Sequence, residues 1–283
     1  MPVVVLRARL GLSSERTDND AVNTRTTIKD EVNADLLAFL KVLSVRTPDR
    51  REEGAMNEPR QGFERADTAV VFIDPQNDVL SNKGAAWAAV GGSVTENRTV
   101  ENMERIFQAV KQHGFEVFIS PHYFYPTDHS WRFNGPLESM ELAEHMFARR
   151  GPLNLDGFSG SGADWLDRFK PYIADGKTIV VSPHKVWGPQ TNDLVLQLRK
   201  RRIAKVILGG MLANICVESH LRDLLEQGFE VIVVRDATAG PRHPEWGDGY
   251  TAALINFRFL AHAVMSTDEV VKSMNAAEPT RHS

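Results

Sequence analysis

From residue 66 onward the sequence alternates between short runs of apolar, often β-branched residues and longer stretches with helical periodicity. Several of the short runs, such as AVVFI and EVIVV, are nearly continuously apolar, which is typical of a parallel sheet buried on both faces. The pattern therefore predicts an α/β fold with a doubly wound, mainly parallel sheet and helices on both faces. The strand candidates are 68–73, 115–120, 178–182, 205–209, 230–235 and 263–266, and the helix candidates are 97–112, 162–170, 190–201, 214–227 and 248–260.

Residues 1–65 have a different character, because polar and charged side chains dominate them. Only the segment 28–43 places apolar residues on one helix face, and the stretch TPDRREEGAMNEPRQG after it has the composition of a linker. We therefore predict an N-terminal extension over 1–65, partly flexible with one possible helix, followed by a single α/β domain over 66–283.

Charge and cysteine content exclude several classes of protein. The 33 Lys and Arg against 37 Asp and Glu leave a net charge of −4, which disfavours a nucleic-acid or anionic-membrane surface. The single cysteine excludes an internal disulfide and a Cys-rich zinc site. No apolar run is long enough to span a membrane, and the N-terminus lacks the pattern of a signal peptide. We expect a cytoplasmic protein.

Three chemically interesting residues follow three different strand candidates. Asp74 comes directly after the first strand, Lys185 lies in a loop with prolines and Trp187 after the third, and Cys216 begins the helix after the fourth. Each has a plain structural interpretation as a turn aspartate, a solvated lysine or a buried core cysteine. Because ligands bind at the carboxyl ends of strands in open α/β sheets, we expect the three side chains to meet there.

The position of Cys216 favours a nucleophile. A helix N-terminus lowers the pKa of a thiol and offers N–H groups to a developing oxyanion, and Gly209 and Gly210 allow the sharp turn before it. Asp74 could then take the thiol proton, and Lys185 could stabilise the resulting charges. Such a set suits acyl transfer from a carbon–nitrogen bond through a thioester.

These residues and their surroundings resemble the isochorismatase-like cysteine hydrolase superfamily, which includes nicotinamidases, carbamoylsarcosine amidase, and ureidoacrylate and biuret hydrolases. The resemblance covers about residues 66–270 and rests on VVFIDPQND, SPHKVWGP and GGMLANICVESHLRDLLEQGFEVIVVRDATAG. It implies a six-stranded parallel sheet and a triad in which Asp74 is the general base, Lys185 the charge stabiliser and Cys216 the nucleophile.

The same resemblance implies the oxyanion site and the assembly. It places a cis peptide at Met211–Leu212, and an oxyanion hole made by the backbone N–H groups of Leu212 and Cys216. Leu212 stands where the family often has Thr, but a backbone N–H does not depend on the side chain. Family members are commonly homodimers or homotetramers, so we expect a homo-oligomer.

The cysteine also separates branches of the family, since true isochorismatases cleave a vinyl ether and need no thiol there. Nicotinamidases carry an Asp-x-His and His metal site after the second strand, and His122, Asp128 and His129 do not keep that spacing. We therefore expect no metal and no other cofactor. His220 and His184 are rival bases by proximity, although the motif favours Asp74.

Two glycine-rich or basic segments invite functions that their context does not support. GFSGSGADW at 157–165 resembles a phosphate-binding loop, but no strand precedes it, so a lid or helix start is the better interpretation. RKRRIAK at 199–205 places cations at a helix C-terminus, which complements the helix dipole.

The segment 123–160, rich in aromatic residues and histidine, is too long for a simple connection and is expected to cover the active site. The candidate substrate-binding residues are His122, Phe124, Trp131, Trp187, Gln190 and Asn214.

The sequence thus predicts a cysteine-dependent hydrolase of a C–N bond in a small amide, carbamoyl or ureido compound. Two alternatives stay open: an ether hydrolase of the isochorismatase type with a bystander cysteine, and a non-catalytic binding or assembly protein that uses residues 1–65 as its arm.

Overall fold

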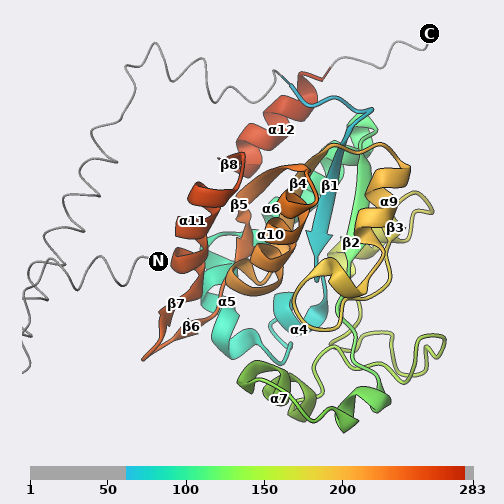
Figure 1. Cartoon of the computed structure of the whole chain (residues 1–283), viewed down its shortest axis with the longest axis vertical. Coiled ribbons are helices and arrows are strands. Elements are labelled where there is room, and N and C mark those ends of the chain that lie inside the picture. The colour runs from blue at the N-terminus through green and yellow to red at the C-terminus, as the bar shows by residue number, and fades with distance from the viewer. Residues whose placement is uncertain (1–61, 278–283) are drawn as a thin grey trace, which may run out of the picture. The chain divides into compact units, whose positions relative to one another are not determined.

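A computed structural model describes residues 62–277, and the helix expected over 28–43 lies outside this range. The core is a six-stranded parallel sheet with the order β3-β2-β1-β4-β5-β8 (Figure 1). This confirms the predicted doubly wound α/β class. The strands are β1 (Thr68–Ile73), β2 (Glu116–Ser120), β3 (Ile179–Val180), β4 (Lys205–Met211), β5 (Glu230–Ala239) and β8 (Ala263–Met265).

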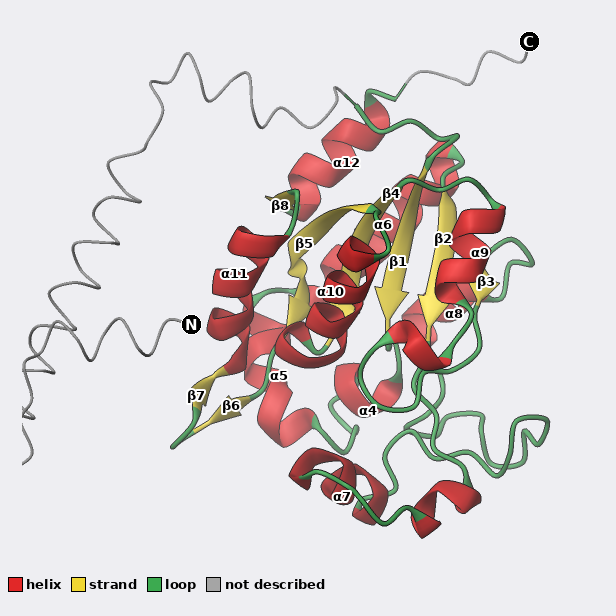
Figure 2. Cartoon of the chain, viewed as in Figure 1, coloured by secondary structure: helices red, strands yellow, loops and turns green. Residues whose placement is uncertain are grey.

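Helices cover both faces of the sheet (Figure 2). Alternate residues of β1 divide between two hydrophobic cores, because side chains along a strand point to opposite faces. Val70 and Phe72 pack in one core with α5 (Trp87–Glu96), α6 (Thr99–His113) and α12 (Thr267–Asn275). Ala69, Val71 and Ile73 pack in the other core with α9 (Leu194–Lys200), α10 (Glu218–Glu226) and α11 (Gly249–Leu260). Both faces are therefore dry, as the continuous apolar strands predicted.

The expected helices 97–112, 190–201 and 248–260 correspond to α6, α9 and α11. The expected helix 162–170 was wrong in extent, since only the short turns Asp167–Phe169 and α8 (Lys170–Ile173) are helical there. Four helices and a hairpin were missed: α4 (Asn77–Leu80), α5, α7 (Pro136–Ala143), α12, and β6 (Arg242–His243) with β7 (Gly247–Asp248).

The missed helix α12 did carry a readable signal. The Ser266 side chain accepts from the N–H of Glu269, and the Glu269 carboxylate accepts from the N–H of Ser266, which is a capping box. Helix α5 offered no comparable signal, because its sequence WAAVGGSVTE contains two glycines and no clear apolar period.

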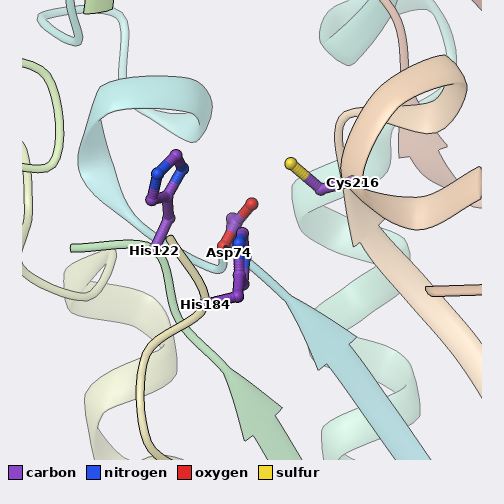
Figure 3. Close-up of side chains that lie close together, drawn as sticks. All are labelled: Asp74, His122, His184 and Cys216. Carbon is purple, nitrogen blue, oxygen red and sulfur yellow. Dashed lines mark hydrogen bonds and ion pairs between the residues drawn. The ribbon is translucent and has the colours of Figure 1, made fainter. Parts of the chain in front are cut away.

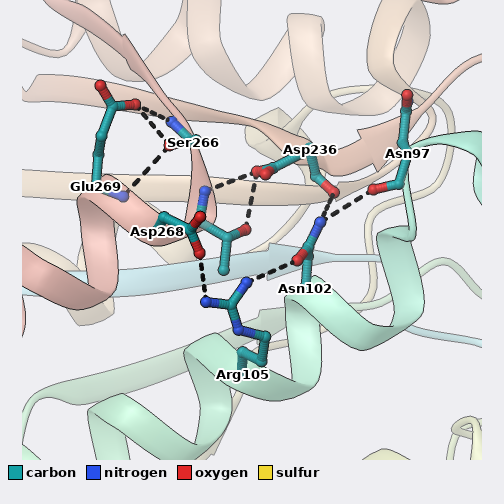
Figure 4. A network of polar contacts seen from close by, with 8 residues as sticks. Asn97, Asn102, Arg105, Asp236, Ser266, Asp268 and Glu269 are labelled. Carbon is teal, nitrogen blue, oxygen red and sulfur yellow. Dashed lines mark hydrogen bonds and ion pairs between the residues drawn. The ribbon is translucent and has the colours of Figure 1, made fainter.

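A polar network fastens α6 and α12 to the end of β5 (Figure 4). The Asp236 carboxylate accepts from the N–H and the hydroxyl of Thr267, at 2.8 Å each. Its carbonyl accepts from the Asn102 side chain at 3.1 Å, and Arg105 donates to both Asn102 and Asp268. Asp236, part of the family-like motif, therefore has a structural role at the start of α12.

Among residues 62–277, no helix is long and apolar enough to cross a membrane. The expected homo-oligomer stays a prediction.

Candidate active site

Asp74 lies at the carboxyl end of β1, where the chain turns sharply. Its backbone adopts a left-handed conformation with φ 48°, which is uncommon outside glycine and is found at functional sites. The Asp74 N–H donates to Ser120 O at 3.0 Å, so the turn stays attached to β2. The side chain is 1% exposed, and a carboxylate with so little water needs polar partners.

Cys216 lies at the same edge of the sheet, in the turn that follows the neighbouring strand β4. After β4 the chain passes through a cis peptide at Met211–Leu212 and a π-helical turn, Ala213–Val217, before α10 begins. The cis bond was an implication of the family resemblance, and the structure contains it. The Cys216 thiol lies within 4.8 Å of the Asp74 carboxylate and points toward it (Figure 3).

His184, and not Lys185, is the partner of Asp74. The His184 Nε2 lies 2.8 Å from Asp74 Oδ1, and both side chains are buried. The backbone of His184 continues the parallel pairing of the sheet, since its N–H donates to Pro121 O at 2.9 Å. Side chains alternate along such an extended segment, so residue 184 faces Asp74 and residue 185 faces away.

The Lys185 ammonium is bound elsewhere. It donates to Asp128 Oδ2 at 2.5 Å and to Tyr123 O at 2.9 Å, and it lies 3.7 Å from the centre of the Tyr125 ring. These contacts hold it in the 123–160 insert. The structure therefore does not bring Lys185 to the position that its predicted role as charge stabiliser requires.

Two further histidines surround the site as neutral groups. His220 Nδ1 donates to the carbonyl of Cys216 at 2.7 Å, and its Nε2 accepts from the Ser120 hydroxyl at 2.9 Å. His122 Nε2 donates to Lys185 O at 3.1 Å. Burial lowers the pKa of both rings well below the usual value. Both ring nitrogens of His220 are thus already hydrogen-bonded, which argues against His220 as the base that deprotonates the thiol.

The environment of the thiol differs from the expectation based on a helix N-terminus. Burial, followed by the negative charges of Asp74 and Glu141, raises the pKa of Cys216 well above its ordinary value, and only a hydrogen bond from the Leu212 backbone opposes this. The expected lowering of the thiol pKa was therefore wrong, because burial and two nearby carboxyls raise the pKa of Cys216. In the resting protein Cys216 is therefore a neutral thiol.

These residues also form a set that could hold a metal ion. One ligand atom from each of Asp74, His122, His184 and Cys216 lies within 4.8 Å of the other three, and all four side chains are buried. Carboxylate, imidazole and thiolate are the usual ligands of Zn²⁺. The ring Nδ1 atoms of His122 and His184 have no hydrogen-bond partner within the described part of the chain.

A cavity of about 330 Å³ opens against Cys216 and Asp74. Its walls are mainly apolar and come from alanines of α5, from the Leu212–Cys216 turn, and from 137–147 of the long insert. The insert therefore does cover this site, as expected. Met146 and Phe147 are fixed against the fold by Asp78, whose carboxylate accepts from the N–H of Phe147 at 2.6 Å.

The candidate substrate-binding residues do not line this cavity. Gln190 is exposed and donates to Asp223 at 3.0 Å, and Asn214 lies against Gly249 of α11. The other four are His122 and three aromatic residues near it: the His122 ring is tilted against Phe124 and meets Trp187 edge-on. Trp131 packs on Phe124. Sequence reasoning favoured aromatic residues, whereas small side chains and one helix of the insert form the actual walls.

The glycine-rich segment 157–165 supports α4 and is neither a lid nor a helix start. Gly162 O accepts from the Asp78 N–H at 2.8 Å, and a Cβ at Gly162 would lie 2.0 Å from the Asp78 carboxylate. Only glycine fits this close approach.

The family model named Isochorismatase domain matches residues 68–269, so the chain belongs to the isochorismatase family. Among curated proteins it is 27% identical over 241 residues to the ureidoacrylate amidohydrolase RutB of Pseudomonas syringae pv. syringae, covering 81% of this chain and 93% of that one. RutB of Stutzerimonas stutzeri is 26% identical over 250 residues, covering 82% and 90%. These named relatives support a hydrolase that acts on carbon–nitrogen bonds.

Solved structures show the same fold. A cysteine hydrolase from Pseudomonas syringae pv. phaseolicola 1448A superposes with a TM-score of 0.63 at 21% identity, covering 79% of this chain and all of that one. N-carbamoylsarcosine amidase from Thermoplasma acidophilum gives 0.53 at 20% identity, covering 71% and 97%.

The raised thiol pKa predicts slow alkylation of the native protein. Because the chain has one cysteine, iodoacetamide labelling reports Cys216 alone. At pH 7 we expect it to react at least about tenfold more slowly than the same cysteine in the urea-unfolded chain, and to accelerate above pH 9.

The variant Asp74→Asn tests the cause. Removing this negative charge lowers the thiol pKa, so the variant should alkylate several-fold faster than the wild type at pH 8. Native labelling that is faster than that of the unfolded chain at pH 6–7 would mean that the helix N-terminus dominates instead.

Proposed function

We propose that this chain is a cysteine hydrolase that cleaves the C–N bond of a small amide, carbamoyl or ureido compound through a thioester. One observation carries the proposal: a buried thiol and a buried carboxylate face the same cavity from adjacent strand ends. A nucleophile and its base within reach of each other, beside a space for a small substrate, are the requirements of covalent acyl transfer.

The first half-reaction follows from the neutral thiol. As the Cys216 sulfur attacks the substrate carbonyl, its proton passes to Asp74, so the charge forms only when substrate is present. The carbonyl oxygen becomes an oxyanion, which the N–H groups of Leu212 and Cys216 are proposed to hold. Both residues support this, because they lie in the turn between β4 and α10 and line the cavity.

The second half-reaction returns the enzyme to its resting state. Collapse of the oxyanion breaks the C–N bond, and the leaving nitrogen takes the proton from Asp74 to depart as ammonia or an amine. A water molecule, deprotonated by Asp74, then attacks the thioester. The acid product leaves, and the sulfur regains its proton.

The contact between His184 and Asp74 supports giving His184 the role that was predicted for Lys185. Its Nε2 lies 2.8 Å from Asp74 Oδ1, so a proton on that nitrogen can hold the carboxylate in one orientation while the other oxygen faces the thiol. We propose His184 as the positioning residue for Asp74, and Lys185 as a loop anchor through Asp128.

A second candidate is a metal-dependent hydrolase, which the four-residue ligand set and the two unpartnered ring nitrogens favour. A Zn²⁺ ion there would supply an activated water. Metal analysis of the purified protein decides between the two: stoichiometric zinc with activity lost to dipicolinate and restored by Zn²⁺ would support this candidate, and full activity in the chelator would remove it.

The primary proposal is tested by ammonia release from nicotinamide, biuret, ureidoacrylate, N-carbamoyl amino acids and aliphatic amides. We expect release from at least one compound, and at least about a 10³-fold loss in Cys216→Ala because the covalent step is gone. Unchanged turnover in that variant would remove the mechanism. A vinyl-ether substrate cleaved equally by both proteins would favour the ether hydrolase, and silence throughout with an unreactive thiol would favour a binding protein.

The exchange of roles between neighbouring residues gives a further prediction. His184→Gln should lower kcat about 10²-fold with little change in KM, because Asp74 loses its partner. Lys185→Met, the matched control one residue away, should lower kcat less than about tenfold and cost about 1 kcal/mol of unfolding free energy through the lost Asp128 pair. Steady-state kinetics and urea unfolding measure both, and the reverse order of losses in kcat would restore Lys185 to the triad.

A further inference from the structure

The cavity beside Cys216 has an unusual charge pattern. Asp74, Glu141 and Glu144 line it, while none of the described residues in its walls is Lys, Arg or His. The remaining lining is apolar apart from the thiol and the backbone. Such a site has no group that could neutralise an anionic substrate.

Glu141 is a buried carboxyl in this cavity with an oxygen that no described residue hydrogen-bonds. Its side chain is buried, with 4% of the residue exposed, and its Oε2 has no hydrogen-bond partner among residues 62–277. Buried carboxyls are normally hydrogen-bonded, so an unpartnered one at a cavity wall indicates a partner that comes from outside the chain.

The helix that carries Glu141 is well fixed. Helix α7 begins with Pro136, and the Glu138 carboxylate accepts from the N–H of Gly135 at 2.8 Å. At the other end the Met146 N–H donates to Glu141 O at 2.9 Å, and Phe147 is held by Asp78. Glu141 is therefore presented to the cavity by a fixed element, as preorganised recognition requires.

We infer that Glu141 is a specificity-determining residue that binds a positively charged nitrogen group, such as an ammonium or amidinium, on the non-reacting part of the substrate. Cleavage of that substrate rests on the proposed function, whereas the binding preference does not. The apolar walls would contact the body of the molecule, and its scissile carbonyl would face Cys216.

A cation satisfies both features of the cavity. It pairs the orphan carboxyl with a charged donor in a water-poor site, where such hydrogen bonds are stronger. A cation is also attracted by Asp74, whereas a carboxylate substrate is repelled by Asp74 and, where Glu141 is ionised, by Glu141 as well. The chain thus differs in its expected preference from relatives named for ureidoacrylate, which carries a carboxylate.

Binding of a cation should release a proton from the site. Burial, then the charges of Asp74, Glu138 and Asp78, raises the pKa of Glu141 to about 8, and the Cys216 thiol also lies within its field. In the free protein below pH 8 this carboxyl is protonated. A bound cation favours the ionised form, so its affinity should rise with pH up to about 8 and level off above.

The binding test uses pentylamine, pentanol and pentanoate on the full chain, by calorimetry at pH 7. We expect pentylamine to bind tightest and pentanoate weakest. Glu141→Gln should weaken pentylamine at least about tenfold and leave pentanol within about threefold. Glu144→Gln makes the same substitution at an exposed residue of the rim and serves as the matched control, with less than a threefold effect on pentylamine.

A measurement on the unaltered protein guards against a variant that fails to fold. Calorimetry in buffers of different ionisation enthalpy should show release of close to one proton on pentylamine binding and none on pentanol binding. Equal affinities for amine and alcohol, tightest binding of pentanoate, absence of binding by all three probes, or no proton release would each overturn the inference.

Turnover of three amides of similar length separates this inference from the proposed function. We expect Cys216-dependent ammonia release to be fastest from 5-aminopentanamide, slower from hexanamide and slowest from glutaramate. Glu141→Gln should remove the preference for 5-aminopentanamide over hexanamide. Selective binding without hydrolysis would contradict the proposed function and leave the inference standing. Cys216-dependent hydrolysis of all three amides without a charge preference would support the proposed function and overturn the inference about Glu141.

Discussion

The close approach of β1 and β4 at their carboxyl ends is the constraint on which the site depends. Ile73 and Gly210 are register partners, and a Cβ at Gly210 would lie 2.1 Å from the Ile73 carbonyl oxygen. Gly210 also has φ 113°, a conformation that other residues rarely adopt. Glycine at this position lets two adjacent strands end together, and so brings the residue after β1, Asp74, to the turn that carries Cys216.

Burial decides the chemistry of the pair that results. The partial charge of a helix start favours an acidic thiol, but desolvation and the Asp74 charge act in the opposite direction and raise the pKa of Cys216 well above its ordinary value. The site therefore holds a neutral thiol next to Asp74. In the proposed mechanism this makes proton transfer to Asp74 part of the attack on the substrate.

The sequence allowed Asp74 and Cys216 to be predicted because both follow long, strongly apolar strands whose ends define the sheet edge. The assignment of Lys185 could not be secured in this way. Strand β3 is only Ile179–Val180, and the SP dipeptide follows it, so the alternation of side chains in the loop depends on pairing with residues 121–122. A shift of one residue there exchanges His184 for Lys185. The cavity walls could not be predicted from the sequence either, since Glu141 and the alanines of α5 are brought together only by long-range packing.

The proposed mechanism requires that Cys216 becomes covalently acylated during turnover. Acid quenching of the enzyme in the first turnovers of a good substrate, followed by intact-mass and peptide mass spectrometry, tests this directly. We expect a mass increase equal to the acyl group, located on the peptide that contains Cys216 and removed by hydroxylamine. Turnover that proceeds with no mass increase under quenching, and continues in the presence of a thiol-blocking reagent, would contradict it.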